Sequence, residues 1–104
     1  MDNKQTVDSN LNSALLSYFK NYKIGVVDIN IANTIGTQTF NVPNVTNANQ
    51  KPIVIGVSCI NKSNNRRYSG ISAFFFAELL RFDTDQDFLN VYYGNPITVV
   101  YMYL

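Results

Sequence analysis

The chain has 104 residues, a formal net charge of +1 and a charged fraction of 14%, against roughly 25% in typical globular domains. Its length predicts a single domain, and its near-neutral charge argues against a nucleic-acid partner. The sequence has no histidine and one cysteine, Cys59, which excludes an internal disulfide, histidine-based catalysis and most zinc sites. We therefore expect a protein that is not an enzyme and that binds no cofactor or metal.

The first 21 residues differ in pattern from the rest of the chain. The start, MDNKQTVDSN, lacks the apolar stretch of a signal peptide, and we expect no membrane span in the chain. Leu11, Leu15 and Tyr18 recur at helical spacing, which predicts a short amphipathic helix over residues 9–20. Two interpretations of its apolar stripe stay open: it packs on its own domain, or it meets identical helices of other copies in a seam.

From Lys23 onward the apolar residues recur with a period of two, which is typical of strands. The first strand changes parity, and this predicts a bulge near residues 25–27. A second strand is expected over residues 37–42, followed by a loop between two prolines. A third is expected over residues 53–60 with clean alternation, which places Cys59 among buried residues.

The second half of the chain predicts further strands separated by turns. Its polar stretch, residues 61–67, indicates a hairpin turn before a strand that starts at Tyr68. The segment over residues 71–82 stays ambiguous, because its aromatic residues favour a strand and AELLR favours a helix. Later segments are expected as an acidic turn over residues 83–87 and strands over residues 88–93 and 97–104. Residues 22–104 thus predict a mainly β domain, an antiparallel sandwich or jelly roll, after a short N-terminal helix.

The acidic residues suggest two possible sites, a calcium loop and a catalytic carboxylate pair, but the sequence lacks the further features that each site needs. The stretch DTDQDF resembles the start of a calcium loop, but Phe88 and Gly94 occupy the places where an EF-hand needs Gly and Glu. We therefore interpret it as a surface turn. A glycosidase-like pair would have to use Asp28 and Glu78, and nothing in the sequence brings these two together.

Two polar loops are the candidate binding sites, because loops carry function on rigid scaffolds and Arg and Tyr are favoured at binding hot spots. The candidates are Asn64, Asn65, Arg66, Arg67 and Tyr68 in the later loop, with Asn47 and Asn49 in the earlier one. A solvated turn is the alternative for both loops. The candidates for an interface between copies are Leu11, Leu15 and Tyr18 of the helix, with Phe74 and Phe76 of the segment that is apolar on both faces. For the late tyrosines Tyr92, Tyr93, Tyr101 and Tyr103 we expect packing, with stacking on sugar rings as the alternative.

The stretch YSGIS after a polar loop, and the terminal strand ITVVYMYL after a Gly-Asn-Pro turn, resemble the small β-structured tip domains of tailed-bacteriophage tail fibres, head fibres and baseplates. The resemblance covers the layout of residues 9–104 and carries over no binding residue. It implies a homotrimeric virion component whose loops bind a host surface glycan or a neighbouring virion protein. The alternative is a monomeric β-sandwich module that binds carbohydrate or a protein partner, in the cytoplasm.

Overall fold

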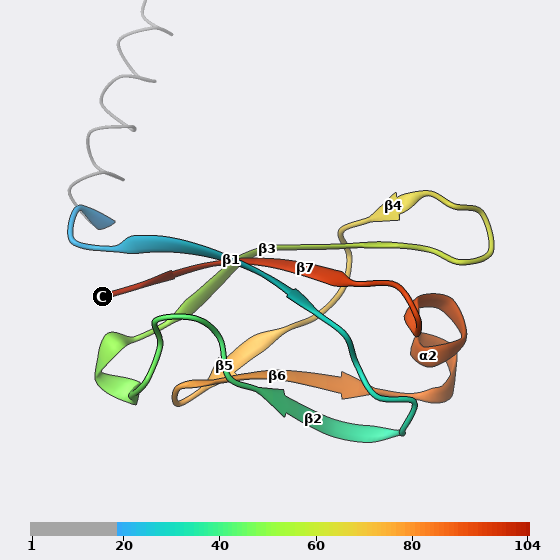
Figure 1. Ribbon diagram of the computed structural model, residues 1–104, viewed down its shortest axis with the longest axis horizontal. Coiled ribbons are helices and arrows are strands. Elements are labelled where there is room, and N and C mark those ends of the chain that lie inside the picture. Colours follow the sequence, from blue (N-terminus) through green and yellow to red (C-terminus); the bar gives the residue numbers. More distant parts are fainter. Residues whose placement is uncertain (1–18) are drawn as a thin grey trace, which may run out of the picture.

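The computed structural model describes residues 19–104. They form two antiparallel sheets, so the prediction of a mainly β fold is confirmed (Figure 1). The strands are β1 (Lys23–Ile29), β2 (Gly36–Phe40), β3 (Ile53–Ile60), β4 (Arg67–Tyr68), β5 (Phe74–Phe76), β6 (Leu79–Thr84) and β7 (Ile97–Tyr103). Helix α2 (Gln86–Tyr92) and the short turn η1 (Ala48–Gln50) complete the described elements. The helix expected over residues 9–20, with Leu11, Leu15 and Tyr18, lies almost wholly outside the described residues.

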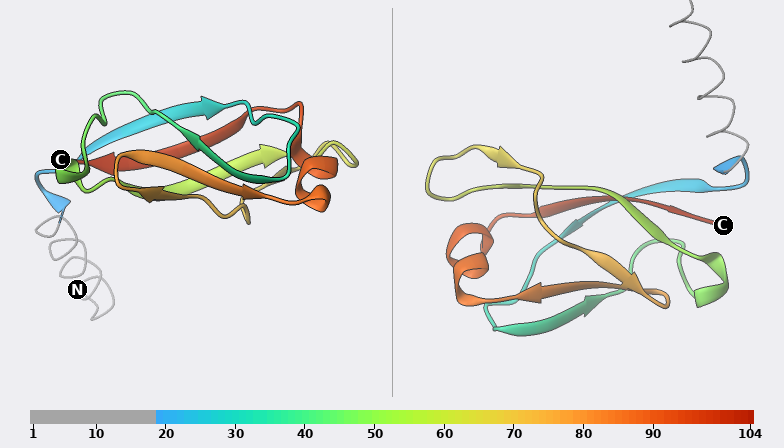
Figure 2. Two further views of the ribbon diagram at one scale, coloured as in Figure 1. Left: turned by 90° about the horizontal axis from the view of Figure 1, so that it is seen from below. Right: turned by 180° about the vertical axis from the view of Figure 1, so that it is seen from behind.

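The first sheet has the strand order β1-β7-β3-β4, and the second has the order β2-β6-β5. In Figure 1 the first sheet forms the upper layer and the second the lower layer, and the right view of Figure 2 shows the same layers from behind. Lys23 pairs with Tyr103 at one end of the first sheet, and Ile29 pairs with Ile97 at the other. We call these the proximal end, where β1 begins, and the hairpin end, where β3 runs into the loop before β4.

The hydrophobic core lies between the two sheets. Strand β7 supplies one side of it, because Ile97, Val99 and Tyr101 are fully buried at alternate positions. The second sheet supplies the other side through residues such as Phe82, which is also fully buried. The Phe75 ring of β5 meets the Tyr101 ring edge-on, with centroids 5.8 Å apart. Every second residue of β7 is therefore buried, as expected for a strand in a sheet that packs one face on the core.

The predicted bulge near residues 25–27 is wrong. Strand β1 pairs with β7 in unbroken register from Lys23 to Ile29. The parity change that suggested a bulge has another cause, since Ile24 and Val26 are apolar residues on the outer face, 65% and 61% exposed. The apolar residues of both parities in β1 therefore lie on the two faces of one regular strand.

The irregularity lies instead in β3, where clean alternation was predicted. The register to β7 shifts between Val54 and Gly56, which leaves Ile55 as an extra residue. Ile55 is 50% exposed, whereas Val57 and Cys59 are buried, so the prediction for Cys59 is confirmed. One extra residue changes which parity faces inward, and the sequence shows no break there because it is apolar on both sides of the shift.

The ambiguous segment over residues 71–82 belongs to a hairpin, so its strand interpretation is confirmed. Strands β5 and β6 pair from Phe74 with Arg81 to Phe76 with Leu79, which leaves a two-residue turn at residues 77–78. Its first residue, Ala77, has a φ of 54°. Such a left-handed conformation suits the tight turns that join antiparallel strands.

The strand predicted over residues 88–93 is wrong, because this segment lies mostly in helix α2. Asp85 caps the helix: its Oδ1 accepts the backbone N–H of Phe88 at 2.8 Å. Phe88 and Tyr92, four residues apart, lie on the helix face that packs on the core beside buried Leu89. The predicted acidic turn is also wrong in part, because β6 continues to Thr84 before the cap. Within residues 19–104, no helix has the length and apolar character needed to cross a membrane.

Candidate functional site

The loop between β3 and β4 is a closed, internally bonded turn, which confirms the predicted hairpin. The strand expected to start at Tyr68 is wrong in its bounds, because β4 ends at that residue. The Asn61 N–H donates to the Arg66 carbonyl oxygen, and the Asn65 N–H donates to the Asn61 carbonyl oxygen, each over 2.8 Å. The Asn61 side chain is buried, and its Oδ1 accepts the Ser63 N–H at 2.7 Å. Asn65 has a φ of 57°, a left-handed conformation that asparagine adopts more readily than most residues.

Asn64 ties the tip of this loop together. Its Oδ1 accepts the Arg66 N–H at 3.0 Å, and its Nδ2 donates to the Tyr68 hydroxyl at 2.6 Å. Tyr68 is 37% exposed, so its side chain is anchored by Asn64 and still accessible. Of the predicted site residues of this loop, Asn64 and Tyr68 are therefore joined through their side chains, together with the backbone of Arg66.

The two arginines of the loop differ in what they contact. Arg67 donates from Nη1 to the Ser58 hydroxyl at 2.7 Å, which links β4 to β3. The exposed guanidinium of Arg66 makes no hydrogen bond or ion pair within the described part of the chain. Arg66 is therefore the arginine that a partner can pair with at no cost to an existing contact.

The residue that ends helix α2, the C-cap Tyr93, lies at the same end of the molecule. The Lys62 N–H donates to the Val91 carbonyl oxygen at 3.0 Å, which fixes the loop against α2. The Lys62 ammonium lies 5.6 Å from the centroid of the Tyr93 ring, within the range of a cation–π contact. Tyr93 is 38% exposed. Sequence reasoning did not single out Lys62, because its partner is set by the position of α2. We call Lys62, Asn64, Arg66, Tyr68 and Tyr93 the hairpin-end surface.

The other late tyrosines are packed, as the sequence predicted. Tyr101 and Tyr103 are buried, and Tyr92 is half-buried against the core. Burial raises the pKa of the Tyr92 and Tyr101 phenols above their ordinary values. Burial likewise raises the pKa of the Cys59 thiol, which disfavours the thiolate. Of the four late tyrosines, Tyr93 alone is exposed enough to stack on a sugar ring.

The second predicted loop, with Asn47 and Asn49, lies at the opposite end of the molecule (Figure 1). Strand β3 separates the two loops; its 8 residues span about 26 Å at about 3.3 Å each. Asn47 is used locally, since its side chain caps η1 and accepts the Asn49 N–H at 3.0 Å. Gln50 then donates to the Leu104 carbonyl oxygen at 3.2 Å, which holds the chain end. The two loops therefore do not form one site.

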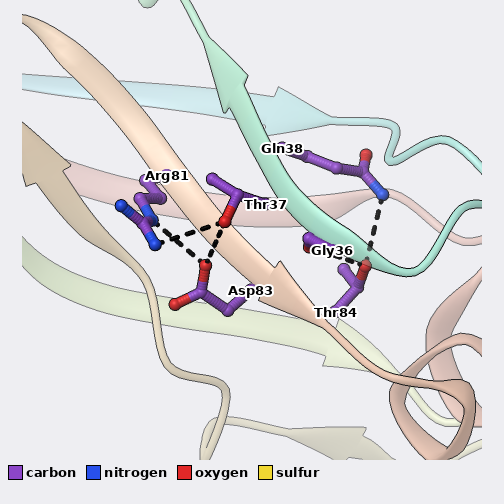
Figure 3. Close-up of polar contacts among 6 residues, drawn as sticks. All are labelled: Gly36, Thr37, Gln38, Arg81, Asp83 and Thr84. Atoms are coloured by element: carbon purple, nitrogen blue, oxygen red, sulfur yellow. Dashed lines mark hydrogen bonds and ion pairs between the residues drawn. The ribbon is translucent and has the colours of Figure 1, made fainter.

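Asp83, the acidic side chain of the second sheet, forms a polar network with its neighbours (Figure 3). Asp83 accepts from Arg81 Nε at 3.0 Å and from the Thr37 hydroxyl at 3.1 Å, and Arg81 also donates to that hydroxyl at 3.2 Å. The Arg81 guanidinium lies 5.3 Å from the Phe74 ring centroid. This network places one ion pair, Arg81 with Asp83, on the outer face of β2 and β6.

Asp28 and Glu78 lie on different sheets. Asp28 is on β1 and accepts from the Thr98 hydroxyl at 2.7 Å, while Glu78 is in the turn between β5 and β6. In the described residues no group of three His, Cys, Asp or Glu side chains is placed to hold a metal ion. The described residues enclose no pocket.

Of the candidates for an interface between copies, only Phe74 and Phe76 lie among the described residues. Both point outward from β5 and are 42% and 65% exposed. The predicted helix residues of this set, Leu11, Leu15 and Tyr18, lie outside the described range.

Comparisons of the chain with protein-family models, with curated proteins and with solved structures found no match in any of the three. Function is therefore inferred from the residues and their geometry.

Proposed function

We propose that this chain is a non-enzymatic structural and attachment protein of a tailed-bacteriophage virion. In this proposal it forms a homotrimeric fibre tip, or decorates the capsid or tail, and its exposed loops bind a host surface glycan or a neighbouring virion protein. One observation carries the proposal: the hairpin-end surface lies at the end of the sheet opposite the one that residues 1–18 join. That arrangement suits a stalk at the proximal end and a contact surface at the hairpin end.

The hairpin-end surface has the chemistry expected of a contact site. It combines two exposed tyrosines, Tyr68 and Tyr93, with the cations Lys62 and Arg66. Aromatic rings and arginine are the side chains most enriched at binding hot spots. Hydrogen bonds at Asn64 hold the tip in one conformation, and a preorganised surface loses less entropy on binding.

Exposed apolar side chains support the oligomeric part of the proposal. Phe74 and Phe76 stand on the outer surface of an edge strand, where contact with another copy would remove apolar area from water. The predicted stripe of Leu11, Leu15 and Tyr18 would meet its equivalents at a threefold axis.

The attachment part is tested by screening the full chain against a glycan array and against dissociated virion proteins. Tyr93→Ala is expected to weaken binding about tenfold or more, because an aromatic hot spot contributes about 2 kcal/mol. Thr39→Ala, at an exposed position of β2 outside both candidate loops, is the control and should bind like the unmodified chain. Equal loss in both variants, or no loss in either, would contradict a site at the hairpin end.

The oligomeric part is tested by the solution mass, measured by light scattering at two concentrations. A trimer whose mass does not change with concentration supports the proposed virion component. A monomer that still loses glycan or protein binding through Tyr93→Ala would instead identify a monomeric binding module, the alternative stated from the sequence.

A further inference from the structure

The loop between β3 and β4 concentrates positive charge that no acidic side chain balances. Lys62, Arg66 and Arg67 are all exposed, and residues 61–77 include no Asp or Glu. The only ion pair of residues 19–104 lies on the second sheet. The three loop cations therefore have no acidic partner in the described part of the chain.

The acidic residues of helix α2 are held away from these cations. Asp85 caps the start of the helix, and Asp87 lies in its first turn. Lys62 instead meets the last turn, because its N–H donates to the Val91 carbonyl oxygen at 3.0 Å. Val91 follows Asp87 by four residues and Asp85 by six, which is roughly 6–9 Å along the axis at about 1.5 Å per residue. The loop cations thus stay available for an anionic partner.

Backbone bonds hold two of the cations a short distance apart. The Asn61 N–H donates to the Arg66 carbonyl oxygen at 2.8 Å, and residues bonded in this way across a hairpin have Cα atoms about 5.5 Å apart. Lys62 follows Asn61 at the usual Cα spacing of about 3.8 Å. The Cα atoms of Lys62 and Arg66 are therefore at most about 9 Å apart, and one short anionic ligand can reach both side chains.

Exposed aromatic rings accompany the cations. The Lys62 ammonium lies 5.6 Å from the centroid of the Tyr93 ring, and that side chain is 38% exposed. Tyr68 is 37% exposed, and its hydroxyl accepts from Asn64. A sugar ring packs its C–H face on such an aromatic side chain. An acidic sugar adds a group that a guanidinium binds through two parallel hydrogen bonds. An acidic peptide would use the cations alone, so the combination of cations and exposed rings favours a saccharide.

We propose that the hairpin-end surface binds an acidic saccharide, with the carboxylate or sulfate of the sugar on Arg66 and the sugar ring on Tyr93. Lys62 adds a second positive charge beside that ring. Arg67 stays bonded to Ser58 and holds the hairpin. The inference rests on the attachment site proposed above and names the chemical class of its ligand. It requires neither the trimer nor the segment before residue 19.

Binding of the full chain to matched pairs of polysaccharides tests the requirement for charge. One pair is polygalacturonate and its carboxyl-reduced form, and the other is dextran sulfate and dextran, so each pair differs in the acidic group. Titration calorimetry should show binding to at least one acidic polymer and none to its neutral counterpart. The affinity should fall as the salt concentration rises, because salt screens exposed charges. The pair that responds identifies the acidic group as carboxylate or sulfate.

Variants locate the acidic group on the loop. Arg66→Gln is expected to weaken binding about tenfold or more, because a hydrogen bond between charged groups is lost. Arg66→Lys should recover part of the affinity, since lysine keeps the charge but not the paired donors. Lys23→Gln removes one positive charge from the exposed start of β1, at the proximal end, and should bind like the unmodified chain. Circular dichroism should be unchanged in all three variants.

The outcomes separate this inference from the proposed function. Equal losses in Arg66→Gln and Lys23→Gln would show attraction by net charge alone and overturn the inference. Equal binding to acidic and neutral polymers, lost in Tyr93→Ala, would overturn it and leave the attachment site standing.

Two further results would also overturn the inference. Tighter binding to poly-L-glutamate than to either acidic polysaccharide would identify an acidic protein as the partner and keep the attachment site. If no polysaccharide binds, the saccharide is excluded, and the screen of virion proteins with Tyr93→Ala then decides the proposed site by itself.

Discussion

The ring of Tyr101 lies over the backbone of Gly25, the residue directly opposite it on β1. A Cβ atom built on Gly25 would lie 2.6 Å from both Cε2 and Oη of Tyr101, closer than two such atoms can approach. The ring is fully buried, and its hydroxyl donates to the Pro43 carbonyl oxygen at 2.7 Å. Gly25 is therefore required because an aromatic ring from the next strand occupies the space of its side chain.

Gly25→Ala is expected to lower the free energy of unfolding by about 2–3 kcal/mol, as overpacking in a core does. Tyr101 can make room only by losing its bond to Pro43, which adds to the cost. Gly56→Ala is the matched control on β3: its Cβ would meet Val100 at 3.9 Å, an ordinary contact. Urea denaturation at one protein concentration measures both variants. Similar losses in the two would contradict the steric explanation.

The stability of the protein should fall at high pH through Tyr101. Burial raises the pKa of its phenol in the folded state above the value of about 10 expected in the unfolded chain. Its contribution is then fully present below about pH 10 and is lost as the pH rises through the folded pKa. Tyr101→Phe should be less stable at neutral pH, because the Pro43 carbonyl loses its donor, and should show a shallower fall above about pH 10.

Thermal unfolding between pH 8 and pH 11 measures this difference in slope. Tyr92 retains part of the effect, because burial raises its pKa in the same direction, so Tyr101→Phe reduces the fall without removing it. A fall as steep as in the unmodified chain would show that ionisation of Tyr101 is not coupled to unfolding.

The sequence predicted the β class because hydrophobic period survives in most strands, but it could not assign the faces of β1 and β3. A glycine in a strand indicates either a bulge or the close approach of another group, and only the position of Tyr101 decides between them at Gly25. In β3, residues of both parities around Ile55 are apolar, so the one-residue register shift cannot be recognised from the sequence pattern. Assigning these faces requires the neighbouring strand, β7.

The hairpin-end surface could be predicted from the sequence only in part, for a similar reason. The turn that carries Asn64 to Tyr68 follows from local signals, since Asn favours turns and left-handed backbone. The pairing of Lys62 with Tyr93 depends on α2, and aromatic residues there favoured a strand. The available signal was Asp85 as a helix cap, with Phe88 and Tyr92 spaced by four residues.

Removing that cap should destabilise α2. Asp85→Ala deletes the acceptor for the Phe88 N–H and is expected to lower the free energy of unfolding by about 1 kcal/mol. Asp87→Ala removes the next carboxylate, which lies in the first turn and makes no capping bond; its effect should stay within about 0.5 kcal/mol. Chemical denaturation of the two variants measures the difference. Equal effects would show that charge near the helix start, and not the cap, stabilises α2.

The two arginines of the hairpin end should separate binding from anchoring. Each replacement by alanine removes one positive charge, but Arg67 alone is bonded to Ser58. Arg67→Ala should therefore loosen the β3–β4 hairpin and speed hydrogen exchange of the Asn61 and Asn65 amides several-fold, since both close this turn. Arg66→Ala should leave those exchange rates unchanged and weaken partner binding, because its guanidinium is the one left available. If Arg66→Ala instead accelerated exchange as much as Arg67→Ala, charge rather than the bond to Ser58 would hold the hairpin, and Arg66 would lose its assignment as the contact residue.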